Sequence, residues 1–519
     1  MKRLLFLAHR WLGLLGCVLI VLWFATGFVM MYVPYPSLLE SERLSRAVPI
    51  AIEEVRITPA RALAAARIGV PASDETQRLR LIQSGSRPVY AVKLATGGWV
   101  GIDAFSGTPL HMSVTLARGV GEQFAGVPAL GAEPVQPDQW SMQAYLDAHR
   151  PLWAVRMADG GVHYLSGRTG EVLRDTSSTE RAWNWVGSVV HWVYPTVLRR
   201  DARLWHWVVV TLSSYALLVA LLGTVIGLLR WRWRDADRRS PYSGWRRWHH
   251  LLGLGCAVFA LAWLTSGLLS MNPGGVFSDM TISNAQARSW HGGSLDDAAV
   301  GRALDAPLPP TSGVALLPAI EVEWWPDGDG APDALVREAA VRARVQYGTN
   351  GQRLWRRGER STNWTMHSVD AAEIGRRLRR IEPALAGAPV LSIQRLDEED
   401  LYHYRRFDPA PPIWRVRLAD AASTWLHVDA GSGELMARLD RSNRVERWAY
   451  HGLHSWDFAA LLEHRPLWDL LMLPALALGF LFSITSVVVA AQRLAAMRKR
   501  ARSRIRPTVP TRAARRTLS

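Results

Sequence analysis

The apolar residues of this chain gather in four windows, at 11–33, 204–229, 251–271 and 467–491. Each window is long enough to cross a bilayer as a helix, which needs roughly 20 apolar residues. Two long polar regions and one short basic loop separate the windows. The pattern therefore predicts four transmembrane helices that carry two large polar domains.

Alternation of apolar and polar positions inside the polar regions predicts short strands joined by tight turns. In the first region residues 57–66 are typical of a helix, and strand hairpins are expected at 88–103 and 152–173. In the second region a hairpin is expected at 414–435 and a weaker one at 342–355. The fold class is thus an α-helical membrane protein with two α+β domains outside the membrane.

The windows and the short amphipathic stretches beside them divide the chain into ten parts. We expect transmembrane helices at 1–33, 204–231, 249–271 and 466–492, large domains at 34–180 and 272–440, interfacial helices at 181–203 and 441–465, a basic loop at 232–248 and a basic tail at 493–519. This is the organisation of a multi-pass membrane protein. Membrane lipid is expected to surround its four helices.

The chain contains a tandem repeat. The segment HRWLGL at 9–14 recurs as HHLLGL at 249–254, and the following apolar helices end in Thr26-Gly27 and Ser266-Gly267, so the offset is 240 residues. The second half of each repeat aligns at an offset of 263, which pairs Trp185 with Trp448. Both repeats start and end on the same side of the membrane. They are therefore parallel repeats, in which corresponding residues lie at the same depth and can face each other.

The net charge of +16 is concentrated in three short segments. The N-terminal residues, the loop at 230–248 and the tail from residue 493 hold 20 Lys and Arg but only 2 acidic residues, whereas the two large regions are close to neutral. This is the positive-inside pattern. It predicts cytoplasmic termini, a cytoplasmic loop and two large domains on the opposite face. Because topology explains the charge, no nucleic-acid partner is expected.

Several classes of site are not supported by the sequence. Cys17 and Cys256 both fall inside apolar windows, so neither a disulfide framework nor a CxxC redox motif is present. No GxGxxG follows a strand and no GxxxxGK[ST] occurs, which excludes the common flavin, NAD and ATP motifs. The first apolar window has no small-residue cleavage site nearby and is interpreted as an uncleaved transmembrane helix.

The hairpin that ends in VDAGSGEL at 428–435 resembles the PepSY domain. Two such regions framed by four membrane helices, with the HRWLG opening at 9–13, make the chain similar to the PepSY-associated transmembrane family. Its best-understood members are FoxB-type ferric-siderophore reductases of the bacterial inner membrane, which carry two b-type haems. The resemblance implies two periplasmic PepSY-type domains and two haem b groups.

The repeat sorts the 15 histidines into candidates for haem iron. His9 and His249 correspond and should meet near the cytoplasmic face, whereas His191 and His454 should meet near the outer face. Two imidazoles on opposite sides of an apolar slot supply both axial ligands of a six-coordinate haem iron. Small residues at 13, 16, 253 and 255 would leave room for the porphyrin. Haems at two depths would carry electrons across the membrane.

Three further histidines remain alternatives for these positions. His250 competes with His249 as the counterpart of His9, and His206 and His451 compete for the outer haem. Eight histidines in the polar domains are expected to be ordinary surface or turn residues. They are His111, His149, His163, His291, His367, His403, His427 and His464.

Haem propionates are anions that a guanidinium binds well. Arg10 lies beside His9 and is a candidate for the inner haem, with Arg246 or Arg247 as its counterpart from the second repeat. Arg181 and Arg444 correspond at the 263 offset and are further candidates. Setting membrane topology is the alternative role of these arginines.

The expected activity is that of a di-haem reductase that moves electrons to the periplasm and reduces a ferric chelate, with a ferric siderophore as the implied substrate. The electron donor would be a membrane quinol or a cytoplasmic reductase, because the chain has no nucleotide motif of its own. Two alternatives stay open. One is a non-catalytic membrane module whose PepSY-type domains bind or regulate a periplasmic partner, and the other is a haem electron-transfer subunit for another oxidoreductase.

Overall fold

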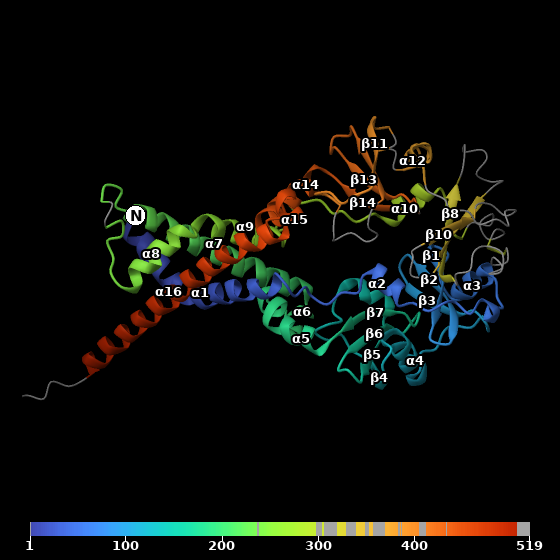
Figure 1. Ribbon diagram of the computed structural model, residues 1–519, viewed down its shortest axis with the longest axis horizontal. Coiled ribbons are helices and arrows are strands. Elements are labelled where there is room, and N and C mark those ends of the chain that lie inside the picture. The colour runs from blue at the N-terminus through green and yellow to red at the C-terminus, as the bar shows by residue number, and fades with distance from the viewer. Residues whose placement is uncertain are drawn as a thin grey trace, which may run out of the picture.

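The computed structural model is elongated, with a helical bundle at one end and β-sheets at the other (Figure 1). It describes residues 2–505 except 236–237, 297–303, 306–318, 329–338, 348–351, 357–368, 382–384, 386, 404–411 and 432. The N-terminus lies at the end of the bundle away from the sheets. We call this the basic end, because the N-terminal lysine and arginine and the loop after residue 230 lie there, and the opposite end the sheet end.

The bundle consists of five helical segments. They are α1 (Lys2–Met30), α7 (Ala202–Arg230), α8 (Trp245–Gly255), α9 (Ala257–Leu269) and α16 (Arg465–Ile505). In the described part of the chain, α1, α7 and α16 are long and apolar enough to cross a membrane, and α8 with α9 makes a fourth span if the bent pair is counted as one. Helix α1 packs against α7 and α16, α8 against α16, and α9 against α7. The predicted membrane-protein class agrees with this bundle.

The third span is broken rather than continuous. Helices α8 and α9 meet at 66° around Cys256, whereas the sequence predicted one helix over 249–271. Gly253 and Gly255 precede the break, and glycine lowers helix stability because it has the most backbone freedom to lose. An apolar window reports length and composition, and it does not report such a bend.

The described residues form three antiparallel sheets beyond the sheet end of the bundle (Figure 1). The first has the order β10 (Gln352–Arg356), β9 (Ala339–Tyr347), β8 (Ala319–Gly328), β1 (Thr76–Ser84), β2 (Arg87–Leu94) and β3 (Gly98–Asp103). The second consists of β4 (Ala129–Val135), β5 (Leu152–Met157), β6 (Val162–Ser166) and β7 (Val172–Thr176). The third consists of β11 (Val390–Leu396), β12 (Ile413–Leu418), β13 (Trp425–Asp429) and β14 (Leu435–Leu439). All four predicted hairpins are present.

The six-stranded sheet joins the two polar regions, which the sequence had divided at the second and third spans. Strand β1 from the first region pairs with β8 from the second, with Leu79 opposite Trp324 and Ile82 opposite Glu321. Leu79 and Trp324 also lie in one buried apolar core. The described sheets therefore form one assembly that spans both regions, with a shared sheet between two sheets that each belong to one region.

Short helices lie beside the sheets and connect them to the bundle. On the sheets these are α2 (Glu40–Ser45), η1 (Ile52–Glu54), α3 (Pro59–Ala66), α4 (Val114–Ala125), η2 (Ala144–His149), α10 (Asn284–His291) and α12 (Ala371–Leu378). At the sheet end of the bundle these are α5 (Ser178–Asn184), α6 (Thr196–Arg199), α14 (Arg441–Arg447) and α15 (Ala459–Glu463). Thr58 caps α3, as expected for a threonine just before a proline at the first helical position.

The predicted interfacial helices at 181–203 and 441–465 take the same form in both repeats. Ser177 and Asp440 each begin the segment with a capping box. Helix α5 then passes into one π-helical turn over Trp185–Val189, and α14 into one over Trp448–Gly452. Isolated π-turns inside helices are rare and frequently occur at functional sites. The second half of each repeat is thus matched in backbone as well as in sequence.

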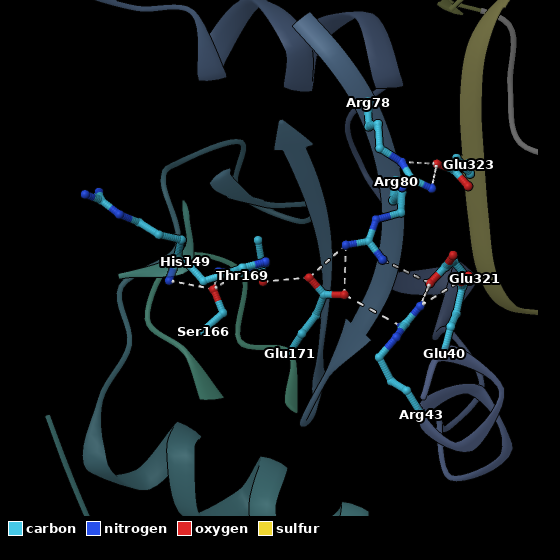
Figure 2. Close-up of polar contacts among 11 residues, drawn as sticks. Glu40, Arg43, Arg78, Arg80, His149, Ser166, Thr169, Glu171, Glu321 and Glu323 are labelled. Atoms are coloured by element: carbon cyan, nitrogen blue, oxygen red, sulfur yellow. Dashed lines mark hydrogen bonds and ion pairs between the residues drawn. The ribbon is translucent and has the colours of Figure 1, made fainter. Parts of the chain in front are cut away.

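A buried cluster of charges holds the sheets together (Figure 2). Arg80 on β1 lies 2.9 Å from Glu171 and 3.4 Å from Glu321, and Arg43 on α2 lies 2.9 Å from Glu321 and 3.6 Å from Glu171. Thr169 also donates a hydrogen bond of 2.8 Å to Glu171. Because Glu171 precedes β7 and Glu321 belongs to β8, the cluster joins two sheets and both polar regions.

Candidate functional site

A cavity of about 1290 Å³ runs through the bundle between α1, α7, α8, α9 and α16. Its lining extends from Phe6 and His9 at the basic end to Tyr35 and Gln143 beside the sheets. This volume exceeds the range of about 300–1,000 Å³ for a site that takes one small molecule. The cavity therefore has room for more than one bound group, or for a group longer than a typical ligand.

His9 and His249 face each other across the basic end of the cavity. Their ring centroids are 6.4 Å apart and their planes differ by 30°. Nδ1 of His9 donates to the carbonyl oxygen of Val219 at 3.2 Å. Nδ1 of His249 lies 3.2 Å from the hydroxyl of Ser486 and 3.4 Å from that of Thr485. The repeat predicted that this pair would meet at one depth, and the geometry agrees.

His191 and His454 face each other at the sheet end of the same cavity. Their ring centroids are 6.1 Å apart and their planes differ by 77°. Each residue lies two positions after the end of the π-turn of its repeat. Nδ1 of His191 lies 2.8 Å from the hydroxyl of Thr26, and Nδ1 of His454 lies 3.0 Å from that of Ser266. Since His9 and Thr26 are 17 residues apart on α1, the two pairs are separated by roughly 25 Å along the bundle at 1.5 Å per residue.

The hydrogen-bond partners determine which nitrogen of each ring carries the proton. Carbonyl oxygen of Val219 can only accept, so His9 is protonated at Nδ1. The hydroxyls of Thr26 and Ser266 donate to main-chain carbonyls at 2.8 and 3.0 Å and hence accept from Nδ1–H. The hydroxyl beside His249 likewise donates to Phe482 O. All four rings are thus held as the tautomer whose Nε2 has a free lone pair.

No described residue forms a hydrogen bond with Nε2 of any of the four histidines, and all four rings line the cavity. Burial lowers the pKa of His191 to about 3, with the neighbouring His454 ring contributing, and burial lowers that of His454 to about 4. Both are therefore neutral at pH 7. A neutral imidazole with Nδ1–H bonded and Nε2 open is the form that ligates a metal ion.

His250 plays a different part from its neighbour. Its Nδ1 lies 2.8 Å from the hydroxyl of Ser240 and its Nε2 lies 2.9 Å from the carbonyl oxygen of Gly227. Both ring nitrogens are therefore engaged, and the side chain is only 7% exposed. Its bonds tie α8 to the end of α7 and to the loop between them. Of the two adjacent histidines, His249 is the one that faces His9.

The alternative histidines at the sheet end do not form a facing pair. His206 does not line the cavity, and its ring packs edge-on against Trp207 at 5.4 Å between centroids. His451 lines the cavity and contacts Tyr450, whose ring stacks on His454 at 5.3 Å. The residue that faces His191 is His454.

The expectation that eight histidines are surface or turn residues is wrong for half of them. The buried ones are His149, His163, His403 and His427. Each packs against another ring, in the contacts His149–Trp99, His163–Phe124 and His403–His427. His163 and His427 lie on strands, and His149 and His403 lie in segments that lead into a strand. One face of each sheet is buried, and the sequence alone does not show which. His367 lies outside the described residues.

Arginines dominate the charge of the cavity. Six arginines and one carboxylate, that of Glu446, line it among the described residues. Three of these arginines lie at the basic end, and they are Arg10, Arg246 and Arg493. The other three lie at the sheet end, and they are Arg199, Arg447 and Arg465. Both ends of the cavity therefore suit anionic groups next to a histidine pair.

Arg181 and Arg444 do not line the cavity. Arg181 donates to the carbonyl oxygens of Thr176 and Gly160, and Arg444 donates to those of Leu439 and Ser423. The two acceptors of Arg181 correspond to the two acceptors of Arg444 at the 263 offset. The two arginines therefore occupy equivalent positions in the repeats, as the sequence predicts. Their described contacts join the interfacial helices to the hairpins, which is a structural role.

Three of the predicted glycines line the cavity, two on α1 and one on α8. Gly13 has no atom of another residue within 4 Å of where a Cβ would stand, whereas Gly16 and Gly253 lie against the rings of Tyr215 and Phe482. Gly255 was expected to provide room as well, but it does not line the cavity. Gly255 is the last residue of α8, directly before the 66° bend to α9.

Sequence reasoning missed the residues that orient the outer histidines. Trp23 and Trp263 donate from their indole nitrogens to the carbonyl oxygens of His191 and His454, at 2.9 and 3.0 Å. Thr26 and Ser266 bind the imidazoles, as described above. The signal was present, because Trp23 and Thr26 recur as Trp263 and Ser266 at the offset of 240. In the sequence, this recurrence indicates only where the apolar helices end.

The donor set limits what the two histidine pairs could hold. Among the described residues, no group of three or more His, Cys, Asp or Glu is close enough together to hold a metal ion. A metal with about 2.0–2.1 Å to one nitrogen of each ring would separate the centroids by about 6 Å, as in both pairs. Two protein ligands suit a metal whose remaining ligands come from an organic group, and they do not suit a tetrahedral zinc site.

Comparison with models of known protein families and with curated proteins gives no match.

Proposed function

We propose that this protein is a di-haem membrane oxidoreductase that transfers electrons from one side of a bacterial inner membrane to a ferric chelate on the other. The observation that carries the proposal is the duplicated pair of facing imidazoles, each oriented with Nδ1–H bonded and Nε2 open to one continuous cavity. Haem b bound at each pair would supply one-electron chemistry at two depths.

The residues of the chain divide the task of binding between them. His9 with His249, and His191 with His454, would hold the iron at the basic end and at the sheet end. The three arginines at each end would pair with the propionates, and this set replaces the Arg181 and Arg444 of the sequence prediction. Apolar walls between the two ends, such as Ile20 and Leu261, would exclude water from the cavity.

The orientation of the protein follows from its charge. An excess of Lys and Arg at the basic end favours a cytoplasmic location for that end and for both termini. The sheets would then lie in the periplasm as PepSY-type domains, which agrees with the resemblance of the hairpin at 428–435 to that family. Electrons would enter at His9 and His249 from a quinol or a cytoplasmic reductase and leave near His191 and His454.

A ferric chelate, with a ferric siderophore as the leading candidate, is the proposed electron acceptor. Oxygen donors hold Fe(III) more tightly than Fe(II), so reduction by one electron would release the iron for uptake. The family resemblance supports this acceptor. A haem electron-transfer subunit for another oxidoreductase is the second candidate, since the same four histidines would serve it. A non-catalytic module with PepSY-type domains would need neither open Nε2 atoms nor a duplicated histidine pair.

Haem quantification tests the proposal most directly. We expect the purified full-length protein to contain two haem b per chain by pyridine haemochrome assay, and to be reoxidised by a ferric chelate in stopped-flow measurements after reduction. A protein without haem would rule out the oxidoreductase. Two haems without reoxidation by ferric chelates would favour the electron-transfer subunit.

The hydroxyl that orients His191 provides a finer prediction. Thr26→Val keeps the shape of the side chain but removes the acceptor of Nδ1–H, which makes the imidazole a poorer ligand. We expect the outer haem to bind about 10–100-fold less tightly, and its midpoint potential to become more positive in a redox titration. Thr224→Val is the matched control, because among the described residues its hydroxyl bonds only to Ala220 O on a helix of the same bundle. Equal behaviour of the two variants would contradict the orienting role.

A further inference from the structure

The two repeats differ at the sheet end of the cavity, although their backbones match. In the first repeat Asn184 and Ser188 are fully buried and hydrogen bonded to each other, and Gly187 packs against Val29. At the corresponding positions the second repeat has Arg447, His451 and Tyr450, and all three line the cavity. One side of the outer histidine pair is therefore closed by packing, and the other carries polar and aromatic side chains.

We define this polar side as the repeat-2 wall. It consists of Tyr402, Asn443, Glu446, Arg447, Tyr450 and His451. The wall reaches the outer histidine pair directly, because the ring of Tyr450 stacks on His454 at 5.3 Å and 29°. Any molecule bound against the wall would thus lie next to the point where electrons leave the protein.

The repeat-2 wall continues onto the neighbouring sheet through Tyr402. Its ring contacts Trp425 at 5.1 Å. Three guanidinium groups lie over Trp425, those of Arg415, Arg417 and Arg444, at 5.1, 4.6 and 4.4 Å from the ring centroid. We call these four residues the Trp425 cluster. In the hairpin of the first repeat Val162 corresponds to Trp425 at the 263 offset, and the strand register places Ala154 at the position of Arg415. This feature therefore also belongs to the second repeat alone.

Among the described residues, the three guanidinium groups of the Trp425 cluster form one ion pair, and Asp420 and Asp440 act on Arg444 beyond ion-pair distance. Arg415 forms an ion pair with Asp400. Arg417 and Arg444 have no carboxylate within ion-pair distance among the described residues, and Nε of Arg417 is buried without a hydrogen-bond partner there. Half-buried guanidinium groups on an aromatic ring favour an anion with a flat or polarisable face.

We propose that the electron acceptor docks on the repeat-2 wall and the Trp425 cluster, and that it is a ferric chelate with net negative charge. This inference rests on the proposed function. One electron would pass from a reduced haem at His191 and His454 to the Fe(III) of the chelate. The chelated iron would become Fe(II), the haem would lose one electron, and no bond to the protein would form or break. The packed side of the first repeat leaves the second as the face for approach.

The repeat provides a matched pair of variants for the test. Arg444→Gln and Arg181→Gln each remove a guanidinium that bonds to two corresponding main-chain carbonyls, but only Arg444 lies over Trp425. Arg417→Gln is a second variant, and it breaks no hydrogen bond among the described residues. The probes are ferric citrate, which is anionic, and a neutral ferric tris-hydroxamate.

With reduced full-length protein, we expect Arg444→Gln and Arg417→Gln to slow reoxidation by ferric citrate about tenfold. Arg181→Gln should react like the unmodified protein, and the neutral chelate should react equally with all variants. Raising the ionic strength should slow only the reaction with ferric citrate. Equal effects of Arg444→Gln and Arg181→Gln, or a citrate reaction that is insensitive to salt, would overturn the docking proposal.

Binding of gallium(III) citrate, which cannot be reduced under these conditions, separates the docking surface from the redox function. We expect it to bind full-length protein and to bind about tenfold more weakly to Arg444→Gln than to Arg181→Gln. Selective binding without any reoxidation by ferric chelates would support the docking site and contradict the reductase function. Reoxidation without selective binding would keep the reductase and reject this docking site.

Discussion

His249→Ala is expected to reduce the haem content from two per chain to one, whereas His250→Ala should leave it at two. The two residues are adjacent on α8, yet their rings have different surroundings. His249 lines the cavity opposite His9, and loss of its imidazole would leave a haem iron bound there with one protein ligand. Nε2–H of His250 already donates a hydrogen bond of 2.9 Å to the carbonyl oxygen of Gly227.

The two variants should also differ in stability. His250→Ala leaves the carbonyl of Gly227 and the hydroxyl of Ser240 without their buried partner, which costs about 1–3 kcal/mol per unsatisfied group. His249→Ala removes a weaker bond of 3.2 Å to Ser486. We therefore expect His250→Ala to melt at a lower temperature than the unmodified protein while keeping both haems, as measured by absorbance and pyridine haemochrome assay. Retention of two haems in His249→Ala would show that His9 and His249 do not form a haem site at the basic end.

The facing pairs show how much a repeat reveals. An offset of 240 residues linked His9 with His249, and an offset of 263 linked His191 with His454, and these are the residues that face each other in the cavity. Equivalent positions in parallel repeats lie at equal depth whatever the details of packing. This part of the site depends only on symmetry, and for that reason it could be predicted.

Side-chain partners were less predictable. One residue along α8 rotates a side chain by about 100°, so both His249 and His250 were compatible with the same apolar helix. The bend at Cys256 and the hydroxyls of Ser240 and Ser486 decide between them, and these belong to three separate segments. The orienting roles of Thr26 and Ser266 likewise depend on where the interfacial helices return to the bundle.

The shared sheet was the largest feature that the sequence did not indicate. Each hairpin is local and could be recognised from alternating residues and turns. The pairing of β1 with β8 joins residues separated by two candidate membrane spans, α7 and the bent pair of α8 and α9, and the alternation of a strand carries no information about its partner. The buried charges of this sheet carry more information, because Arg80 and Glu321 require each other once water is excluded.

Removal of Glu171 is therefore expected to loosen the whole assembly of sheets. Its carboxylate lies 2.9 Å from Arg80 and 3.6 Å from Arg43 and is 8% exposed. Glu171→Ala would leave two buried guanidinium groups with too little negative charge, which typically costs about 3–5 kcal/mol. The corresponding residue in the second repeat, Glu434, is 44% exposed and lies 4.0 Å from Arg78, so Glu434→Ala should cost at most about 1 kcal/mol.

The two variants can be compared by thermal unfolding of the purified protein. We expect Glu171→Ala to lower the melting temperature of the sheets by about 10 °C and Glu434→Ala to change it little. Burial alone would raise the pKa of Glu171, but Arg80 and Arg43 outweigh this and hold its pKa below the usual range. Its contribution should thus be complete above the ordinary glutamate pKa of about 4.3 and be lost as the pH falls through the lowered value. Equal melting temperatures for the two variants at pH 7 would show that the charge cluster does not hold the sheets together.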